Sequence, residues 1–141
     1  IVGVSDAPGV AGKLFSKLGE HNVNIDMIIQ SNERKNETNN ITFTVSEDDY
    51  LEAKKVTESM MEVLGAERVD GDTDIVKVSI VGVGMISKPG VAATMFTTLG
   101  NHGVNIQLIT TSEIKVSCAI SSEQADVAVK ALHDAFELNL I

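Results

Sequence analysis

One segment of this chain occurs twice. Residues 8–31 read PGVAGKLFSKLGEHNVNIDMIIQS and residues 89–112 read PGVAATMFTTLGNHGVNIQLITTS, with 13 identities over 24 gap-free positions. A repeat of this length predicts two related units in tandem, and we expect them over residues 1–72 and 73–141. Units of roughly 70 residues are at the small end of what folds alone, so each should pack on another unit or on a partner chain.

The first copy has the patterning of a mixed α and β domain. The β-branched residues 1–5 predict a strand, which a turn at Asp6 joins to an amphipathic helix over residues 9–21. Residues 24–31 and the alternating residues 41–45 predict two more strands. The polar run between them, residues 32–40, predicts a loop.

A second helix follows in the first copy. Ser46 with Asp49 loosely fits a capping box at its start, and residues 66–70 predict a weak closing strand before a linker at residues 71–73. The apolar residues that we expect on the buried face of this helix are Ala53, Val56, Met60 and Val63.

The second copy repeats the order. It has predicted strands at residues 75–83, 105–111 and 114–120. Its first helix carries Val91, Ala92, Met95, Phe96 and Leu99, and its last carries Ala125, Ala128, Val129, Leu132 and Phe136. The β-α-β-β-α order predicts an α+β fold of two tandem ferredoxin-like (βαββαβ) domains, of which the second lacks one strand in this sequence.

Aligning the copies also predicts a difference in loop length. Pro8 matches Pro89 at an offset of 81, whereas Ile41 matches Ile114 at an offset of 73. We therefore expect eight extra residues in the strand–strand loop of the first copy.

Composition excludes several classes of function. The net charge of −9 disfavours nucleic acid and anionic membranes as partners, and the absence of Trp disfavours RNA-binding domains of the same fold. The lone Cys118, in an alternating run, is expected to be a core thiol in a cytoplasmic protein. There is no signal peptide or membrane-length apolar run, and a start inside a strand suggests a piece of a longer protein.

The two Pro-Gly-Val turns are the candidate ligand sites. Each turn leads into the N-terminus of a helix, where unpaired N–H groups can bind a carboxylate. Gly9 lets backbone approach a ligand closely, and Asp6 adds a carboxylate that suits an ammonium group, so together they complement a free amino acid. The same residues also make a good turn, and spacing alone favours that interpretation. The second copy has Ser87 in place of Asp6, so the copies should not bind equally.

Other polar residues carry weaker signals. Gln30 and Thr111 differ between the copies and are candidate specificity positions, although both could be ordinary solvated strand residues. His21 and His102 are best explained by a favourable interaction with a helix C-terminus. We find no metal-ligand spacing, no phosphate loop and no nucleophile–base pair, so nothing in these residues indicates catalysis.

The residues VSIVGVGMISKPGVAATMF followed by GVNIQLITTSEIKVSCAI resemble the second ACT domain of the aspartate kinase (aspartokinase) family. The run IVGVSDAPGVAGKLF with NVNIDMIIQS is similar to the first ACT domain of that family. The resemblance implies a regulatory region that binds threonine or lysine for feedback inhibition, acting as a homodimer or with a catalytic partner. ATP and magnesium would belong to the kinase domain, with no cofactor and no metal in this piece.

The resemblance also implies an effector site where ACT domains pack together. One part would be formed by Asp6, Gly9, Ala11, Asn24, Ile25 and Gln30. Asn105 and Ile106 would supply the facing surface, and Ser112 and Glu113 match a stretch linked to feedback control. In the family, a strand of the second domain comes from before the first.

Two alternatives remain beside this interpretation. An ACT-type sensor of another biosynthetic enzyme would share the turns, but the stretch TSEIKVS favours aspartokinase. A small ferredoxin-like enzyme such as an acylphosphatase would need a phosphate-binding arginine in a loop, whereas Arg34 and Arg68 lie in no Gly-rich turn.

Overall fold

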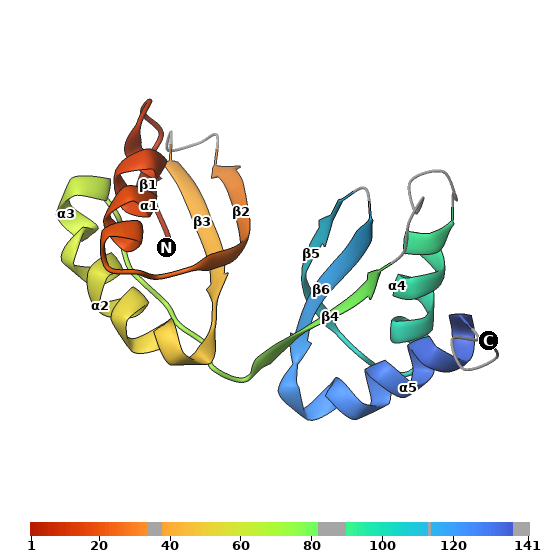
Figure 1. Ribbon diagram of the computed structural model, residues 1–141. Coiled ribbons are helices and arrows are strands. Elements are labelled where there is room, and N and C mark those ends of the chain that lie inside the picture. The colour runs from red at the N-terminus through yellow and green to blue at the C-terminus, as the bar shows by residue number, and fades with distance from the viewer. Residues whose placement is uncertain (34–37, 82–89, 113, 137–141) are drawn as a thin grey trace. The chain divides into compact units, whose positions relative to one another are not determined.

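The chain divides into two compact units, Ile1–Thr73 and Asp74–Ile141, each of which is described by itself (Figure 1). The structure is a computed structural model that describes residues 1–33, 38–81, 90–112 and 114–136. Each unit contains a three-stranded antiparallel sheet with helices, and this confirms the predicted ferredoxin-like architecture.

The first unit has the strand order β1-β3-β2. Its elements are β1 Val4–Ser5, α1 Val10–Glu20, β2 Ile25–Glu33, β3 Thr38–Val45, η1 Glu47–Asp49, α2 Tyr50–Ser59 and α3 Met61–Leu64. Ile1 extends the β1 side of the sheet, because its backbone N and O both bond to Ile41. The predicted closing strand is reduced to one antiparallel bridge between Val2 and Arg68.

The core of the first unit lies between this sheet and its helices, which cover one face (Figure 1). The phenyl rings of Phe15 and Phe43 also meet edge to face, with centroids 5.6 Å apart. Side chains from every layer are fully buried here, and they include Val4, Leu14, Leu18, Ile41, Val56 and Leu64.

The second unit has the equivalent strand order β4-β6-β5. Its elements are β4 Ile75–Val81, α4 Val91–Asn101, β5 Ile106–Thr111, β6 Lys115–Ser121, η3 Ser122–Gln124 and α5 Ala125–Phe136. Cys118 is fully buried among apolar side chains, as predicted, and burial raises the pKa of its thiol. The described residues of this unit contain no fourth strand, and residues 137–141 lie outside them.

The predicted loop over residues 32–40 is wrong at both ends. β2 continues to Glu33 and β3 begins at Thr38, with Asn32 opposite Asn39 and Glu33 opposite Thr38. Backbone pairing between strands needs no apolar side chain, so a polar sequence can extend a hairpin beyond the core.

The second predicted helix is also interrupted. It breaks at Met60 into α2 and α3, so the helical phase changes and Leu64 is buried, whereas Val63 is 56% exposed. The predicted capping box is absent, because the Ser46 side chain makes no cap hydrogen bond. In α5 the buried face includes Ala131 in place of the predicted Val129, which is 48% exposed.

The strand registers correct the expected difference in loop length. Ile28 pairs with Phe43 and Ile109 pairs with Cys118, with an irregularity at the same place in both ladders. Ile28 and Ile109 are 81 positions apart, whereas Phe43 and Cys118 are 75 apart. The first hairpin therefore has six extra residues, and not eight, and the structural counterpart of Ile41 is Val116.

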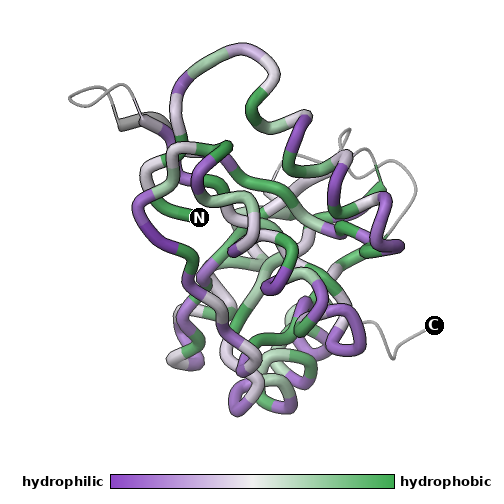
Figure 2. Tube along the Cα trace, turned by 90° about the vertical axis from the view of Figure 1, so that its left-hand side faces the viewer, coloured by the Kyte–Doolittle hydropathy of each residue, from purple (hydrophilic) through white to green (hydrophobic). Residues whose placement is uncertain are grey.

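Short hydrophobic stretches alternate with hydrophilic ones along the trace (Figure 2). Among the described residues, no helix is long and apolar enough to cross a membrane.

Candidate functional site

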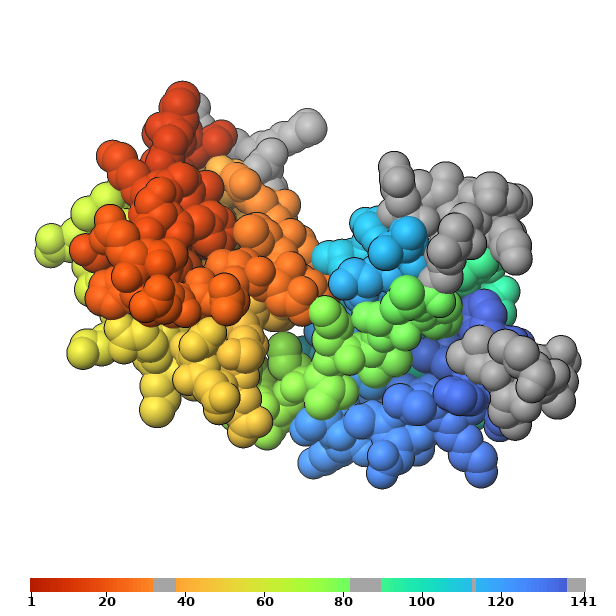
Figure 3. Space-filling model, viewed as in Figure 1, coloured from red at the N-terminus to blue at the C-terminus, as the bar shows by residue number. Residues whose placement is uncertain are grey.

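The connection from β1 to α1 forms an exposed end of the first unit, drawn in red (Figures 1 and 3). Gly9 is the N-cap of α1 and has φ 85°, a left-handed conformation that glycine adopts without strain. No side chain caps this helix, and the N–H groups of Ala11 and Gly12 find no acceptor among the described residues. These groups and the helix dipole leave partial positive charge here, which suits a carboxylate.

The second unit enters its first helix in the same way. Gly90 is the N-cap of α4, has φ 97° and is followed by no side-chain cap. Ser87, the predicted counterpart of Asp6, lies outside the described residues. Among the described residues, a carboxylate beside such a turn is therefore found in the first unit.

Asp6 is held by a residue that the sequence analysis missed. The Nδ2 group of Asn39 on β3 donates a hydrogen bond of 3.1 Å to Oδ1 of Asp6. Asn39 lies opposite Val4 in the ladder and on the same face as Ile41, so it is a polar side chain among core positions. The polar run around Asn39 predicts a loop, but the alternation of Ile41, Phe43 and Val45, continued towards the N-terminus, places Asn39 on the buried face.

Asn39 is unusual among the buried polar side chains of the described residues. Thr57 and Ser117 are also buried, but the hydroxyl of Thr57 donates to the Ala53 carbonyl at 2.7 Å and that of Ser117 bonds to Ser79. Asn39 is 4% exposed, and its Oδ1 atom has no hydrogen-bond partner among the residues that the structure describes. A buried acceptor without a partner costs about 1–3 kcal/mol, so this residue weakens the fold where it stands.

Gln30 lies near this end of the sheet. It pairs with Ile41, two residues along β3 from Asn39, and its side chain is exposed. The structure thus places Asp6, Gly9, Ala11 and Gln30 around one end of the first unit. The exposed carboxylate, the N–H groups without an acceptor and the exposed amide are separate polar groups at this end.

Asn24 and Ile25 lie at the other end of the same sheet. Ile25 pairs with Val45, whereas Asp6 follows the strand end where Val4 pairs with Asn39. Asn39 and Val45, which mark these two ends, are six steps apart along β3, a distance of roughly 20 Å. The first unit therefore does not bring Asn24 and Ile25 together with Asp6, and a single small ligand bound to this unit cannot contact both ends.

Asn24 and Asn105 have matching structural roles. The backbone N–H of Asn24 donates to Oδ2 of Asp49, and that of Asn105 donates to Oε1 of Gln124, both at 3.4 Å. These bonds tie the start of each central hairpin to the short helix that follows it. Ile25 and Ile106 pack against the two hydrophobic cores.

Ser112 lies at the turn between β5 and β6. Its backbone N–H donates to the Lys115 carbonyl at 2.8 Å, and its hydroxyl accepts from the Lys115 N–H at 3.2 Å. These contacts close the tight turn and account for a serine there. Glu113 lies outside the described residues.

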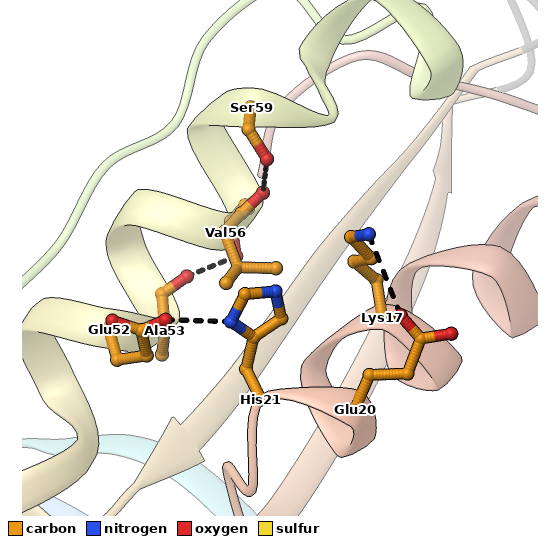
Figure 4. A network of polar contacts seen from close by, with 8 residues as sticks. Lys17, Glu20, His21, Glu52, Ala53, Val56 and Ser59 are labelled. Atoms are coloured by element: carbon orange, nitrogen blue, oxygen red, sulfur yellow. Dashed lines mark hydrogen bonds and ion pairs between the residues drawn. The ribbon is translucent and has the colours of Figure 1, made fainter.

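The two predicted helix-end histidines are both C-cap residues. His21 follows α1 and contacts Glu52 on α2, beside an ion pair between Lys17 and Glu20 (Figure 4). His102 follows α4 and its Nδ1 lies 2.9 Å from the Thr98 carbonyl oxygen. In the part of the chain that the structure describes, no three His, Cys, Asp or Glu residues are grouped to hold a metal ion.

Comparison with known proteins adds to this geometry. The ACT domain family matches residues 1–61 and 78–136. An aspartokinase of Pseudomonas aeruginosa is 49% identical over 139 residues, which cover 99% of this chain and 34% of the relative. This chain therefore spans about a third of the length of the curated relatives that it matches.

Solved structures give the same picture. The aspartokinase alpha and beta subunits share 42% identity and a TM-score of 0.90, covering 97% of this chain and 89% of that one. The ligand-free regulatory subunit of aspartate kinase from Thermus thermophilus shares 41% identity and a TM-score of 0.87, covering 96% and 89%. Aspartokinase III of E. coli, in complex with lysine and aspartate, is 25% identical with a TM-score of 0.65, covering 91% and 27%.

Proposed function

Because the chain belongs to the ACT domain family, among the regulatory regions of aspartokinases, we propose that it senses a free amino acid and inhibits an aspartate kinase. The kinase would phosphorylate L-aspartate with ATP and magnesium in a separate catalytic domain or subunit. The effector would be an end product, with threonine the first candidate and lysine the second.

One observation carries the proposal. The turn that carries the Asp6 carboxylate leads directly into α1, whose first N–H groups have no acceptor among the described residues. An α-ammonium group would pair with the carboxylate, while the ligand carboxylate would accept from the N–H groups of Ala11 and Gly12. Gly9 leaves room for this approach, because a side chain added there would meet nothing within 4 Å.

The relatives support the choice of ligand class. The aspartokinase III of E. coli was crystallised with lysine, and this favours a small amino acid as effector here. Asn105, Ile106, Ser112 and Glu113 are retained in the proposal as effector-site residues of the second unit, and Asn24 and Ile25 would serve a site other than that of Asp6.

Regulation would follow from differential binding. The effector would favour one packing of ACT domains over another, in proportion to its difference in affinity for the two states. We further propose a cytoplasmic homodimer through ACT–ACT packing, in contact with the kinase domain or subunit.

Calorimetric titration of the chain with threonine, lysine and methionine tests the proposal. We expect saturable binding of threonine or lysine and an upward shift of the unfolding temperature. The matched control is the N-acetyl derivative of the ligand that binds, which lacks the ammonium group and should not bind. Absence of heat and of thermal shift with all three amino acids would overturn the proposal for this chain.

A further inference from the structure

Asn39 is a buried amide whose two ends have different environments. Its Nδ2 group donates to Oδ1 of Asp6, and its own Oδ1 atom is buried without a partner. The opposite orientation of the amide would place an acceptor against the Asp6 carboxylate, so the contact with Asp6 fixes the orientation. The side chain thus holds the carboxylate and leaves one of its own polar atoms unsatisfied.

The second unit has no buried amide at the position equivalent to Asn39. The register that equates Phe43 with Cys118 also equates Asn39 with Ile114. Ile114, however, lies just before β6 in the turn that Ser112 closes, and it is 50% exposed, whereas Asn39 is buried within β3. An apolar residue would remove the unsatisfied acceptor, so the buried amide of the first unit has a role other than stability.

We propose that Asn39 is a positioning residue that holds the Asp6 carboxylate ready for the ammonium group of the effector. This inference rests on the proposed amino-acid binding. An exposed aspartate on a turn samples several rotamers, and a hydrogen bond from a buried donor on β3 restricts it to the one that faces the ligand. Because the second unit lacks this amide, the proposal also explains why the two copies would bind unequally.

The mechanism predicts coupling between the two residues. Asn39 acts only through Asp6, so its removal should matter only while Asp6 is present. If the role of Asn39 were merely structural, its substitution would have the same effect on binding whether position 6 carries Asp or Ala.

A double-mutant cycle on the full chain tests the inference, with Asn39→Leu, Asp6→Ala and the double variant. Titration with threonine and with lysine measures the dissociation constant, and urea unfolding of each variant measures stability. We expect Asn39→Leu to weaken binding by about tenfold, with an unfolding midpoint equal to or above that of the unsubstituted chain. In the Asp6→Ala background the same change should have no effect on binding.

The reciprocal variant Ile114→Asn is the matched control, since it places an amide at the equivalent position of the second unit. It should leave the affinity unchanged and, because Ile114 is 50% exposed, change the unfolding midpoint little. Two outcomes would overturn this inference alone, provided that the unsubstituted chain binds. In one, the Asn39→Leu variant binds as tightly as the unsubstituted chain. In the other, the substitution weakens binding to the same extent with Asp6 and with Ala at position 6. If the unsubstituted chain binds neither amino acid, the proposed function fails and this inference fails with it.

Discussion

The Nδ1 atom of His21 lies 2.8 Å from Oε1 of Glu52, and this contact joins the C-terminal end of α1 to α2 (Figure 4). The second unit replaces it with a contact inside one helix, from His102 to the Thr98 carbonyl oxygen. Its residue equivalent to Glu52 is Val127, which lies 75 positions later. The two units therefore hold corresponding helix ends by different means.

Replacing Glu52 by valine should cost little stability. Both side chains of the pair are more than a third exposed, so solvent screens the interaction and we expect a loss of about 0.5 kcal/mol. Urea unfolding measures it, with Glu58→Val as a control because Glu58 makes a longer contact of 3.9 Å with Lys54. A loss above about 2 kcal/mol for Glu52→Val would contradict a screened surface contact.

The helix break at Met60 predicts opposite results for two neighbouring residues. Leu64 is fully buried, so Leu64→Ala should destabilise the chain by about 2–5 kcal/mol. Val63 is exposed, so Val63→Ala should change stability by no more than about 0.5 kcal/mol. Denaturant unfolding of both variants measures the difference. Similar losses in the two variants would mean that α2 continues unbroken and buries Val63.

Gly9 and Gly12 differ in backbone conformation, but both have room for an added Cβ atom. A Cβ at either would meet nothing within 4 Å, yet only Gly9 has a positive φ. Gly9→Ala should therefore cost about 1 kcal/mol, while Gly12→Ala inside α1 should stabilise by about 0.5–1 kcal/mol. Thermal unfolding measures both, and a stabilising Gly9→Ala would show that the left-handed N-cap is wrong.

Cys118 predicts a pH dependence of stability. Its pKa is raised by desolvation, so the native state favours the protonated thiol. The contribution of the protonated thiol to the free energy of unfolding is fully present below the ordinary thiol pKa. It is lost as pH rises through the pKa that the thiol has in the folded state. The stability difference between the unsubstituted chain and Cys118→Ala should therefore shrink from pH 7 to pH 10 in urea unfolding. A constant difference over that range would argue against a desolvated thiol.

Asp6 should matter more to ligand binding than its counterpart in the second copy. Asp6→Ala removes the group that would pair with an ammonium, so we expect the affinity for threonine or lysine to fall by at least tenfold. Ser87→Ala removes no charge and should change affinity less than twofold. Calorimetry measures both, and equal effects would refute the predicted inequality of the two copies.

Most of the fold could be predicted from the sequence because each core element has a clear period. Ile41, Phe43 and Val45 alternate, and Leu14 and Leu18 repeat at helical spacing, so periodicity alone places them in the core. Thr38 and Asn39 continue the same strand, and the alternation does extend to Asn39, but both residues are polar and so carry no hydrophobic signal.

The site could be predicted less completely. Asp6 and Gly9 are only three positions apart in sequence, so the local chemistry of their turn can be predicted without a structure. Asn39 meets Asp6 through pairing between β1 and β3, a contact between residues 33 positions apart. The separation of Asn24 from Asp6 has the same origin, because strand direction decides which end of the sheet each residue occupies.

The two hairpins, Ile25–Val45 and Ile106–Ile120, face their helices in the same register and carry their irregularity at the same step. The two hairpins are in effect interchangeable modules. If one hairpin replaced the other at these end pairs, the side chains that face the helices would still face them, because the strand register is the same. The first hairpin is six residues longer than the second, and this difference in length would travel with the exchanged hairpin. Duplication followed by change in such a segment can alter what one copy recognises while the layer beneath it stays fixed.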